Sequence, residues 1–486
     1  MSTITQHDDR AMWDGVRRFA ALPDWLDAAT QPNRFIEALA RAIPEFASGA
    51  LAIRECDIGH VRLKRDYWTG VYELTIEGPG AGERRVVALR GTILPPESTE
   101  NHPEGTQLRT EKPFGSEGWQ GHLPELNLRL EMQPPDAALP ALPVLTDPDA
   151  ARALLERSIR AAAPKYQELR IAACAPKIMR YSPGSRCTIL YRLQYPAELA
   201  DRDWPAIVVA KTYKGGKGKH AYAGMRALWE SEFTRNGGVT LAEPLAFLPD
   251  MNVLVQGPIR QEQTLQELIA SALRDRTADA LDTLYTAMRQ TAAGLAGLHR
   301  SEVRFGKVRT WEDELAEVRS VVDDLASAIP WIANAAAPLL ARLEVAASAH
   351  PADPIMTIHG TFRPGQVLLY QGEIGFIDFD SFCQAEPALD LSLFLRRTKD
   401  IALGVLNDGE AAGQDGRAAL LSQAEAVCEV FLSEYESRVA VSRQRVALWE
   451  ALDLFTLVLH CWTKVKPERL TNSMLALERH LQRIGL

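Results

Sequence analysis

The sequence predicts an α+β protein, with short antiparallel strands in two regions and a large helical region after the second of them. Two observations lead to this prediction. Within 56–90 and 177–255, apolar residues alternate with polar ones or run together over short stretches, as they do in strands. From residue 259 onward, apolar residues mostly recur at helical spacing, and only the loop-rich stretch 355–383 has strand character.

The composition restricts the class of protein. The chain has 486 residues, a length that corresponds to about two to four domains. Its 54 lysines and arginines against 63 aspartates and glutamates give a net charge of -9, and 46% of its residues are hydrophobic, which is ordinary for a soluble globular protein. An acidic chain is not expected to bind nucleic acid through a basic surface, because phosphate neutralisation needs clustered lysine and arginine.

The cysteines and the N-terminal residues favour a cytoplasmic location. None of the six cysteines forms a C-x-x-C pair, which argues against a zinc ribbon or a thioredoxin-like redox site. The N-terminus has no basic segment followed by an apolar one, so a signal peptide is not expected. No uncharged apolar run approaches the roughly 18 residues that a membrane helix needs. We therefore expect no membrane association, and the sequence leaves the oligomeric state open.

The first region is expected to begin with helices and to continue as a strand meander. Apolar residues at helical spacing run as far as Pro44. The proline-rich stretch 94–143 is expected to be a loop, and a helix is predicted over 147–160, with Asp147 or Asp149 near its N-cap. The predicted strands of this region are 61–63, 71–76 and 86–90.

The second region repeats the alternation of strand, turn and strand. A strand that begins at Ile178 runs into the Pro-Gly turn before Arg186, and a helix is expected over 220–233. The further strands are 187–193, 207–213 and 253–255. Beyond them, helices are expected at 281–299, 311–326, 332–347, 417–440 and 443–463.

The two strand regions resemble an internal repeat. In both, an arginine precedes a tyrosine by ten or eleven residues, and a cation follows at the end of the third strand. The first region is therefore either a degenerate copy of the second or an unrelated antiparallel meander. The corresponding residues are Arg62, Tyr72 and Arg90 in the first region and Arg180, Tyr191 and Lys211 in the second.

Three motifs follow one another in the C-terminal half. They are His359-Gly-Thr-Phe-Arg-Pro-Gly-Gln-Val-Leu-Leu369, Gly375-Phe-Ile-Asp-Phe-Asp380 and Glu386-Pro-Ala-Leu-Asp-Leu391. In order and spacing they resemble the catalytic segment of the aminoglycoside phosphotransferase and choline kinase-like family. The resemblance covers about two thirds of the chain and implies a two-lobed protein kinase-like fold, with ATP and Mg²⁺ used to phosphorylate a hydroxyl of a small polar molecule. It places the domains at 1–165, 166–258 (the smaller lobe) and 259–486 (the helical lobe).

The resemblance also implies metal ligands. Asp378 stands where the family has its main Mg²⁺-binding aspartate, and Gln366 stands where it has an asparagine. Carboxylate and carboxamide oxygens are the ligands that Mg²⁺ prefers. The glutamine keeps the carboxamide oxygen one methylene further out, so metal binding by Gln366 is plausible.

The catalytic loop departs from the family pattern at Thr361, which replaces the catalytic aspartate. A threonine hydroxyl cannot act as a base at neutral pH, and Arg363 adds positive charge beside it. Asp380 is a second carboxylate near the metal aspartate. It is either a compensating metal ligand or base, or a turn residue that bonds its own backbone.

The other motifs concern the nucleotide and the loop. Lys211 resembles the family's phosphate-binding lysine, and its carboxylate partner is expected on the next helix, at Glu230 or Glu232. His359 is expected to bond the backbone near Asp378, and Asp390 to bond the catalytic loop and cap its helix. Nucleotide contacts are further expected at Ser182 and Gly184 in the turn, and at Gln256 and Pro258 in the hinge between the lobes.

Two functions remain open on this basis. One is an ATP-dependent phosphotransferase that acts on a small polar molecule. The other is a pseudokinase, a nucleotide-binding or scaffold module that lost phosphotransfer when Thr361 replaced aspartate. Transfer of a different group from ATP, such as adenylyl, is a third possibility.

Overall fold

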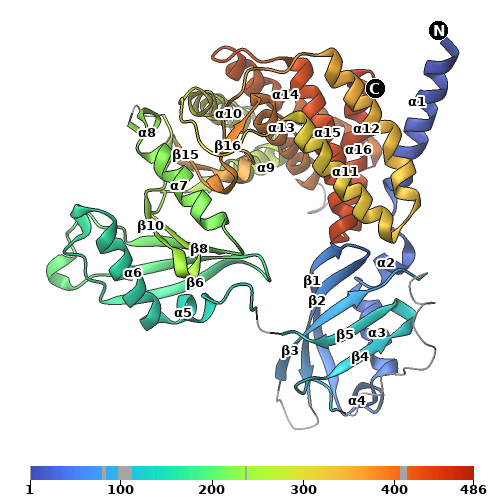
Figure 1. The fold of residues 1–486 in the computed structure, drawn as a ribbon, viewed down its shortest axis with the longest axis horizontal. Helices are drawn as coiled ribbons and strands as arrows, with labels where there is room; N and C mark the ends of the chain where they lie inside the picture. The colour runs from blue at the N-terminus through green and yellow to red at the C-terminus, as the bar shows by residue number, and fades with distance from the viewer. Residues whose placement is uncertain (1, 79–83, 97–111, 135, 236–237, 406–412) are drawn as a thin grey trace. The chain divides into compact units, whose positions relative to one another are not determined.

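The structure is a computed structural model that describes residues 2–78, 84–96, 112–134, 136–235, 238–405 and 413–486 (Figure 1). The chain divides into two compact units, each made of several stretches of sequence. The first unit comprises residues 1–135, 312–348 and 454–486, and the second comprises 136–311 and 349–453. Neither unit is continuous, and the first division along the chain falls after residue 135 and not at 165.

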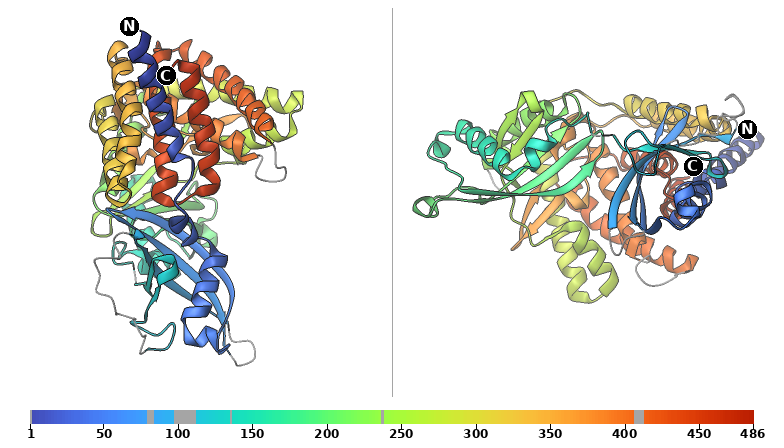
Figure 2. Two further views of the ribbon diagram at one scale, coloured as in Figure 1. Left: turned by 90° about the vertical axis from the view of Figure 1, so that its right-hand side faces the viewer. Right: turned by 90° about the horizontal axis from the view of Figure 1, so that it is seen from below.

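The first unit combines one antiparallel sheet with a group of helices. Its helix α1 packs closely on helix α12, where a side chain at Gly15 would lie 2.4 Å from the carbonyl oxygen of Ala335. Figure 2 shows α1, in dark blue, beside the gold helix α12 and the red helix α16. The aromatic rings of Phe19, Trp331 and Trp462 meet edge to face there, at 5.5–5.8 Å between centroids.

The first unit contains most of the helices and strands that the sequence predicts for this part of the chain. The helices are α1 (Ser2–Arg17), α2 (Asp24–Ala28), α3 (Pro32–Ala42), α4 (Pro44–Ala47), α11 (Trp311–Ala328), α12 (Trp331–Ala349), the second half of α15 (Arg443–Lys464) and α16 (Pro467–Ile484). The sheet has the order β1-β2-β3-β5-β4, with β1 (Ala52–Lys64), β2 (Tyr67–Glu77), β3 (Arg84–Ile93), β4 (Gln120–Leu123) and β5 (Leu128–Met132). The prediction of a loop over 94–143 is wrong in part, because β4 and β5 lie within it.

The second unit has a small β lobe and a larger helical lobe, as predicted. The β lobe is an antiparallel sheet of order β10-β11-β8-β7-β6, and helix α6 packs on it (Figure 1). Asp147 begins α6 as the N-cap, accepting a hydrogen bond from the backbone of Ala150 at 2.7 Å, as predicted. The elements are α5 (Leu142–Thr146), α6 (Pro148–Ala162), β6 (Ala173–Ser182), β7 (Arg186–Gln194), β8 (Ile207–Tyr213), α7 (Lys217–Trp229), α8 (Glu232–Arg235), β9 (Thr240–Leu241), β10 (Pro244–Leu248) and β11 (Val253–Gln256).

The helical lobe surrounds two small sheets that carry the sequence motifs. Its elements are β12 (Gln263–Thr264), α9 (Leu265–Asp275), α10 (Ala278–His299), β13 (Met356–Ile358), β14 (Val367–Tyr370), β15 (Glu373–Phe376), the short 3-10 turn η8 (Phe379–Ser381), β16 (Cys383–Ala385), α13 (Pro387–Gly404), α14 (Gln414–Glu436) and the first half of α15. Helix α15 is long and apolar enough to cross a membrane, but 72% of its most apolar window is buried within the protein. That degree of burial is typical of a core helix.

Candidate functional site

One buried carboxylate holds the loop that begins at His359. Asp390 lies in the first turn of α13 and is fully buried. It accepts hydrogen bonds from the backbone N–H groups of His359, Gly360 and Phe362, at 2.6, 2.9 and 3.3 Å. The predicted bond to the loop is present, whereas the predicted cap is not, because the N-cap position of α13 is Glu386.

Two histidines complete this network. The side chain of His299 lies between Asp390, with Nε2 at 3.2 Å from Oδ2, and the hydroxyl of Tyr435 at 2.7 Å from Nδ1. Burial by itself would raise the pKa of Asp390, but the adjoining His299 and the backbone N–H groups lower it below its usual value. The ring of His359 lies 3.0 Å from the carbonyl oxygen of Ile377, the contact that the resemblance implies.

The loop needs a glycine at one position. Gly360 has a φ of 82°, in the left-handed region. A side chain there would lie 2.2 Å from the carbonyl oxygen of Ser381. The loop and the segment 378–381 can therefore approach closely only because residue 360 has no Cβ.

Asp378 lies at the centre of the site. It has a φ of 75°, a strained conformation for a residue other than glycine, and such strain is concentrated at functional positions. Its Oδ1 lies 2.8 Å from Lys211 Nζ, and its Oδ2 accepts from Gln366 Nε2 at 3.1 Å. Arg363 is 3.6 Å from the same Oδ2. Burial alone would raise the pKa of Asp378, but the ammonium of Lys211 outweighs it and lowers that pKa.

Asp378 and Gln366 fit the requirements of a Mg²⁺ site that is completed by phosphate oxygens. The side-chain oxygen of Gln366 is buried and has no hydrogen-bond partner among the described residues. Because Nε2 is the atom that faces Asp378, a cation beside Asp378 would give that oxygen a partner once the carboxamide turned over. In the described part of the chain, no group of three or more His, Cys, Asp and Glu side chains is placed to hold a metal ion. A site here would therefore use few protein ligands, as Mg²⁺ sites in phosphate-transferring enzymes do.

Asp380 faces the β lobe. Its Oδ1 accepts from the hydroxyl of Tyr213 at 2.8 Å and lies 3.3 Å from Lys211 Nζ. Its Oδ2 lies 3.7 Å from Arg186 Nη1. The groups that contact the carboxylate of Asp380 are thus side chains of β7 and β8. They are not its own backbone, which was the alternative of a turn residue.

Three cations surround these two carboxylates. They are Lys211, Arg186 and Arg363, and the surplus of positive charge suits a polyanionic ligand such as a triphosphate. Sequence reasoning missed Arg186 and Tyr213. The signal for Tyr213 was its position two residues after Lys211, which puts both side chains on one face of β8.

The expected pairing of Lys211 with a helix glutamate is not formed. Glu230 follows the last residue of α7, and its exposed carboxylate pairs with Arg226 one turn earlier. Glu232 begins the next short helix and is also exposed. The carboxylates that contact Lys211 are instead Asp378 and Asp380.

The turn and the hinge have the expected positions at the ends of β6 and β11. In the turn, Ser185 N–H donates to the carbonyl of Ser182 at 3.0 Å, and Gly184 N–H donates to Asp136 at 2.8 Å. Gln256 is buried at the end of β11, and its side-chain oxygen has no partner among the described residues. It lines a cavity of only about 10 Å³ together with Asp378. Pro258 follows it in the connection to the helical lobe.

Thr361 is half-buried in the loop. Its hydroxyl makes no hydrogen bond to any residue that the structure describes. The position that the family fills with a carboxylate therefore holds a neutral group without a fixed partner.

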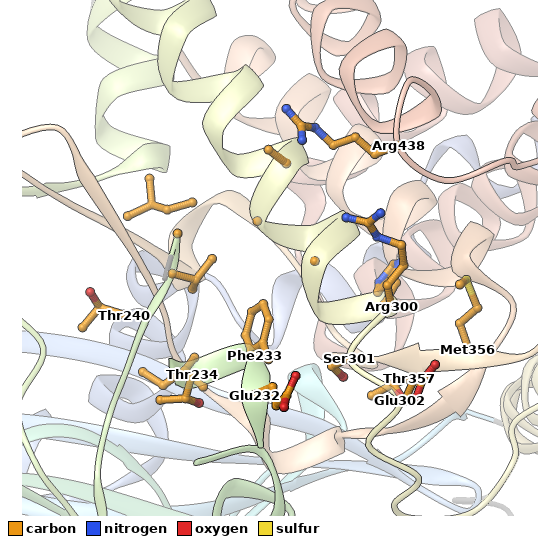
Figure 3. A pocket seen from close by; sticks show the side chains of 18 of the residues that line it. Glu232, Phe233, Thr234, Thr240, Arg300, Ser301, Glu302, Met356, Thr357 and Arg438 are labelled. Atoms are coloured by element: carbon orange, nitrogen blue, oxygen red, sulfur yellow. The ribbon is translucent and has the colours of Figure 1, made fainter. Parts of the chain in front are cut away.

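A larger cavity, of about 2030 Å³, does not include these residues. It lies between α8, β9, the end of α10 and β15, as Figure 3 shows. The guanidinium groups of Arg300 and Arg438 extend in the same direction within it, and Arg438 is paired with Glu434. The cavity lies apart from Lys211 and Asp378.

Several solved structures and one family model are similar to parts of this chain. The solved structures that resemble this chain include a glucosamine kinase in complex with glucosamine, ADP and inorganic phosphate (15% identity, 92% of this chain and 99% of that chain, TM-score 0.44). They also include a choline/ethanolamine kinase family protein from Mesorhizobium loti (14%, 69% and 98%, 0.43) and a choline kinase from Streptococcus pneumoniae (15%, 69% and 99%, 0.41). The comparison with curated proteins found no match. The model of the phosphotransferase enzyme family matches residues 243–425, which include the three sequence motifs.

Proposed function

We propose that the second unit binds ATP with Mg²⁺ and transfers the terminal phosphoryl group to a hydroxyl of a small polar molecule. The observation that carries the proposal is the meeting of Lys211 from the β lobe with Asp378 from the helical lobe, 2.8 Å apart. Gln366 adjoins Asp378, and the match to the phosphotransferase family covers both Asp378 and Gln366. The proposed location is the reducing cytosol, since all six cysteines are unpaired.

Each residue has a role in this proposal. Lys211 and Arg186 bind phosphate oxygens, because cations form the strongest hydrogen bonds with them. Asp378 and Gln366 would hold Mg²⁺, which when bound would neutralise charge on the transferred group. The turn of Ser182 and Gly184 covers the phosphates, and Gln256 and Pro258 border the base.

The transfer requires little covalent work from the protein. The acceptor oxygen forms a bond to the γ-phosphorus, the bond to the bridging oxygen of ADP breaks, and the hydroxyl proton leaves to solvent. Positioning and electrostatic stabilisation supply most of the acceleration in phosphoryl transfer. A loop without a carboxylate at Thr361 is therefore compatible with turnover.

The same threonine favours the second candidate, a nucleotide-binding module without phosphotransfer. The candidates differ in one measurement. We expect the unmodified protein to phosphorylate at least one member of a panel of aminoglycosides, glucosamine, choline and neutral sugars in the presence of MgATP. Thr361→Ala should then leave that rate nearly unchanged. A protein that binds ATP but whose phosphotransfer is near zero, and that gains about 10²–10⁴-fold with Thr361→Asp, would identify the second candidate.

Metal dependence tests the assignment of Asp378. ATP should raise the melting temperature of the protein in the presence of Mg²⁺, and Asp378→Asn should abolish the Mg²⁺-dependent part of that rise. Gln366→Ala should reduce it less, because its longer side chain places the oxygen less well. If Gln366→Ala had the larger effect, the two assignments would be reversed, and if ATP gave no rise at all, the proposed nucleotide binding would be wrong.

A further inference from the structure

We propose that Asp380 is the residue that positions Lys211 for the nucleotide phosphates, in place of a glutamate on the following helix. The inference rests on the proposed nucleotide binding. It assigns Asp380 a role that acts through Lys211, and therefore a positioning role rather than that of a base.

Lys211 needs a carboxylate partner because it is largely buried. Its side chain is only 12% exposed, and an unpaired ammonium in such a place carries a large desolvation penalty. Two carboxylates meet it, Asp378 at 2.8 Å and Asp380 at 3.3 Å. If Asp378 turns its oxygens to Mg²⁺, Asp380 is the carboxylate that remains with the lysine.

Asp380 is itself held in a fixed orientation. The hydroxyl of Tyr213 donates to its Oδ1 at 2.8 Å, and Arg186 approaches its Oδ2 to 3.7 Å. All three partners come from the adjacent strands β7 and β8, so the carboxylate is turned toward the β lobe. Both oxygens of this carboxylate therefore face side chains of the β lobe, and the same contacts hold it against Lys211.

The helix glutamate does not compete for this role. Glu230 is 59% exposed and pairs with Arg226, four residues earlier on the same helix. Glu232 is exposed as well. Asp380 instead lies two residues after Asp378, in the turn η8, so one short segment supplies both carboxylates that contact Lys211.

A double-mutant cycle on ATP binding tests whether Asp380 acts through Lys211. By calorimetry with MgATP, Asp380→Asn should weaken ATP binding about tenfold, because Lys211 then loses the carboxylate that stays with it when Asp378 faces Mg²⁺. In the Lys211→Ala background, the same Asp380→Asn change should alter affinity less than about twofold, since its target is gone. An equal effect in both backgrounds would overturn the proposal and make Asp380 an independent or metal-binding residue.

A second measurement needs no nucleotide. The reaction rate of Lys211 with an amine acylating reagent, followed by mass spectrometry, should rise several-fold in Asp380→Asn and stay unchanged in Glu230→Gln. The pair Lys165 and Glu243, 2.9 Å apart, offers a matched control, because Glu243→Gln should raise the reactivity of Lys165 and leave that of Lys211 unaltered. Unchanged reactivity of Lys211 in Asp380→Asn would overturn the proposal even if the protein bound no ATP.

Discussion

The two five-stranded sheets of this molecule are built in the same order, but only one of them carries the candidate site. The first sheet runs β1-β2-β3-β5-β4, and the second runs β6-β7-β8-β11-β10, which is the same order of strands along the chain. In both, the fourth strand of the sheet in sequence lies at the edge. Residues that both sheets share can therefore be assigned to folding, and residues that only the second sheet has can be assigned to the candidate site.

The register of the strands agrees with the shared order. Tyr72 of β2 and Tyr191 of β7 occupy corresponding positions, and both are fully buried. The hydroxyl of Tyr72 donates to the carbonyl of Ala29 at 2.8 Å, and that of Tyr191 donates to the carbonyl of Leu145 at 2.7 Å. In each sheet the acceptor lies shortly before a helix that begins with proline, α3 or α6.

Two further features recur. Arg62 and Arg180 each follow an irregularity in the first strand, and each is paired with a threonine of the second strand. The last two strands are joined in both sheets by a 3-10 turn, 124–126 or 249–251, that ends at a left-handed asparagine. These correspondences support the hypothesis that the first region is a degenerate copy of the second.

The sheets differ where the chemistry lies. In the shared register, Lys211 lies opposite Thr188, and its counterpart opposite Thr69 is Thr92. The predicted correspondence of Arg90 with Lys211 is therefore wrong by two residues. The first sheet has the same buried positions, but it has a threonine and not a cation at the position of Lys211.

The largest effect is expected when Lys211 of the second sheet is replaced by threonine, the residue at the corresponding position of the first sheet. Lys211→Thr should weaken ATP binding by about 1.5–3 kcal/mol, roughly 10–100-fold, because one charge-assisted contact to phosphate is lost. Isothermal titration calorimetry measures the change. The matched variant Thr92→Ala should bind ATP as the unmodified protein does, and a loss of affinity there would show that the first sheet takes part in nucleotide binding.

Much of the fold could be predicted because strong periodicity identified its longer elements. The helices α6, α10 and α12 and the strands β7 and β8 were predicted close to their observed bounds, whereas β6 begins at Ala173, before the predicted Ile178. The strands β4, β5 and β10 were missed, because four or five residues among prolines give too little pattern to distinguish a strand from a loop. The helix α16 was also missed, although its apolar residues recur at helical spacing.

The site could be predicted only in the parts that the motifs carry. The spacing of the motifs identified Lys211, Gln366 and Asp378, and the structure brings these three together. The partners of Asp380 could not be found in this way, because Tyr213 and Arg186 lie far from it in sequence. The carboxylate that pairs with a lysine depends on how the two lobes pack, and the residues next to the lysine in sequence do not determine that packing.

The second-largest expected effect concerns Tyr72 and Tyr191, and it tests whether the two tyrosines stabilise their sheets to the same extent. Tyr72→Phe and Tyr191→Phe should each destabilise the protein by about 1–3 kcal/mol, because each leaves a buried carbonyl without its donor. Urea unfolding followed by tryptophan fluorescence measures the change. Tyr67→Phe is the control, since its hydroxyl has no partner among the described residues, and it should cost less than about 0.5 kcal/mol. If only one of the buried tyrosines mattered, the two sheets would not be stabilised in the same way.

The smallest effect concerns the asparagines that end the two turns. Asn127 and Asn252 have φ values of 48° and 51°, so glycine suits both backbones. Asn252 additionally donates to the carbonyls of Tyr213, at 2.7 Å, and Gly215, and thereby fixes the end of the strand that carries Lys211. Asn252→Gly should therefore cost about 1 kcal/mol in urea unfolding, the net value of a side-chain hydrogen bond. Asn127→Gly should stay within about 0.5 kcal/mol of the unmodified protein, because its side chain has no hydrogen-bond partner in the described part of the chain. Equal costs at the two positions would mean that the turn geometry alone, and not the contact to β8, accounts for the asparagine in the second sheet.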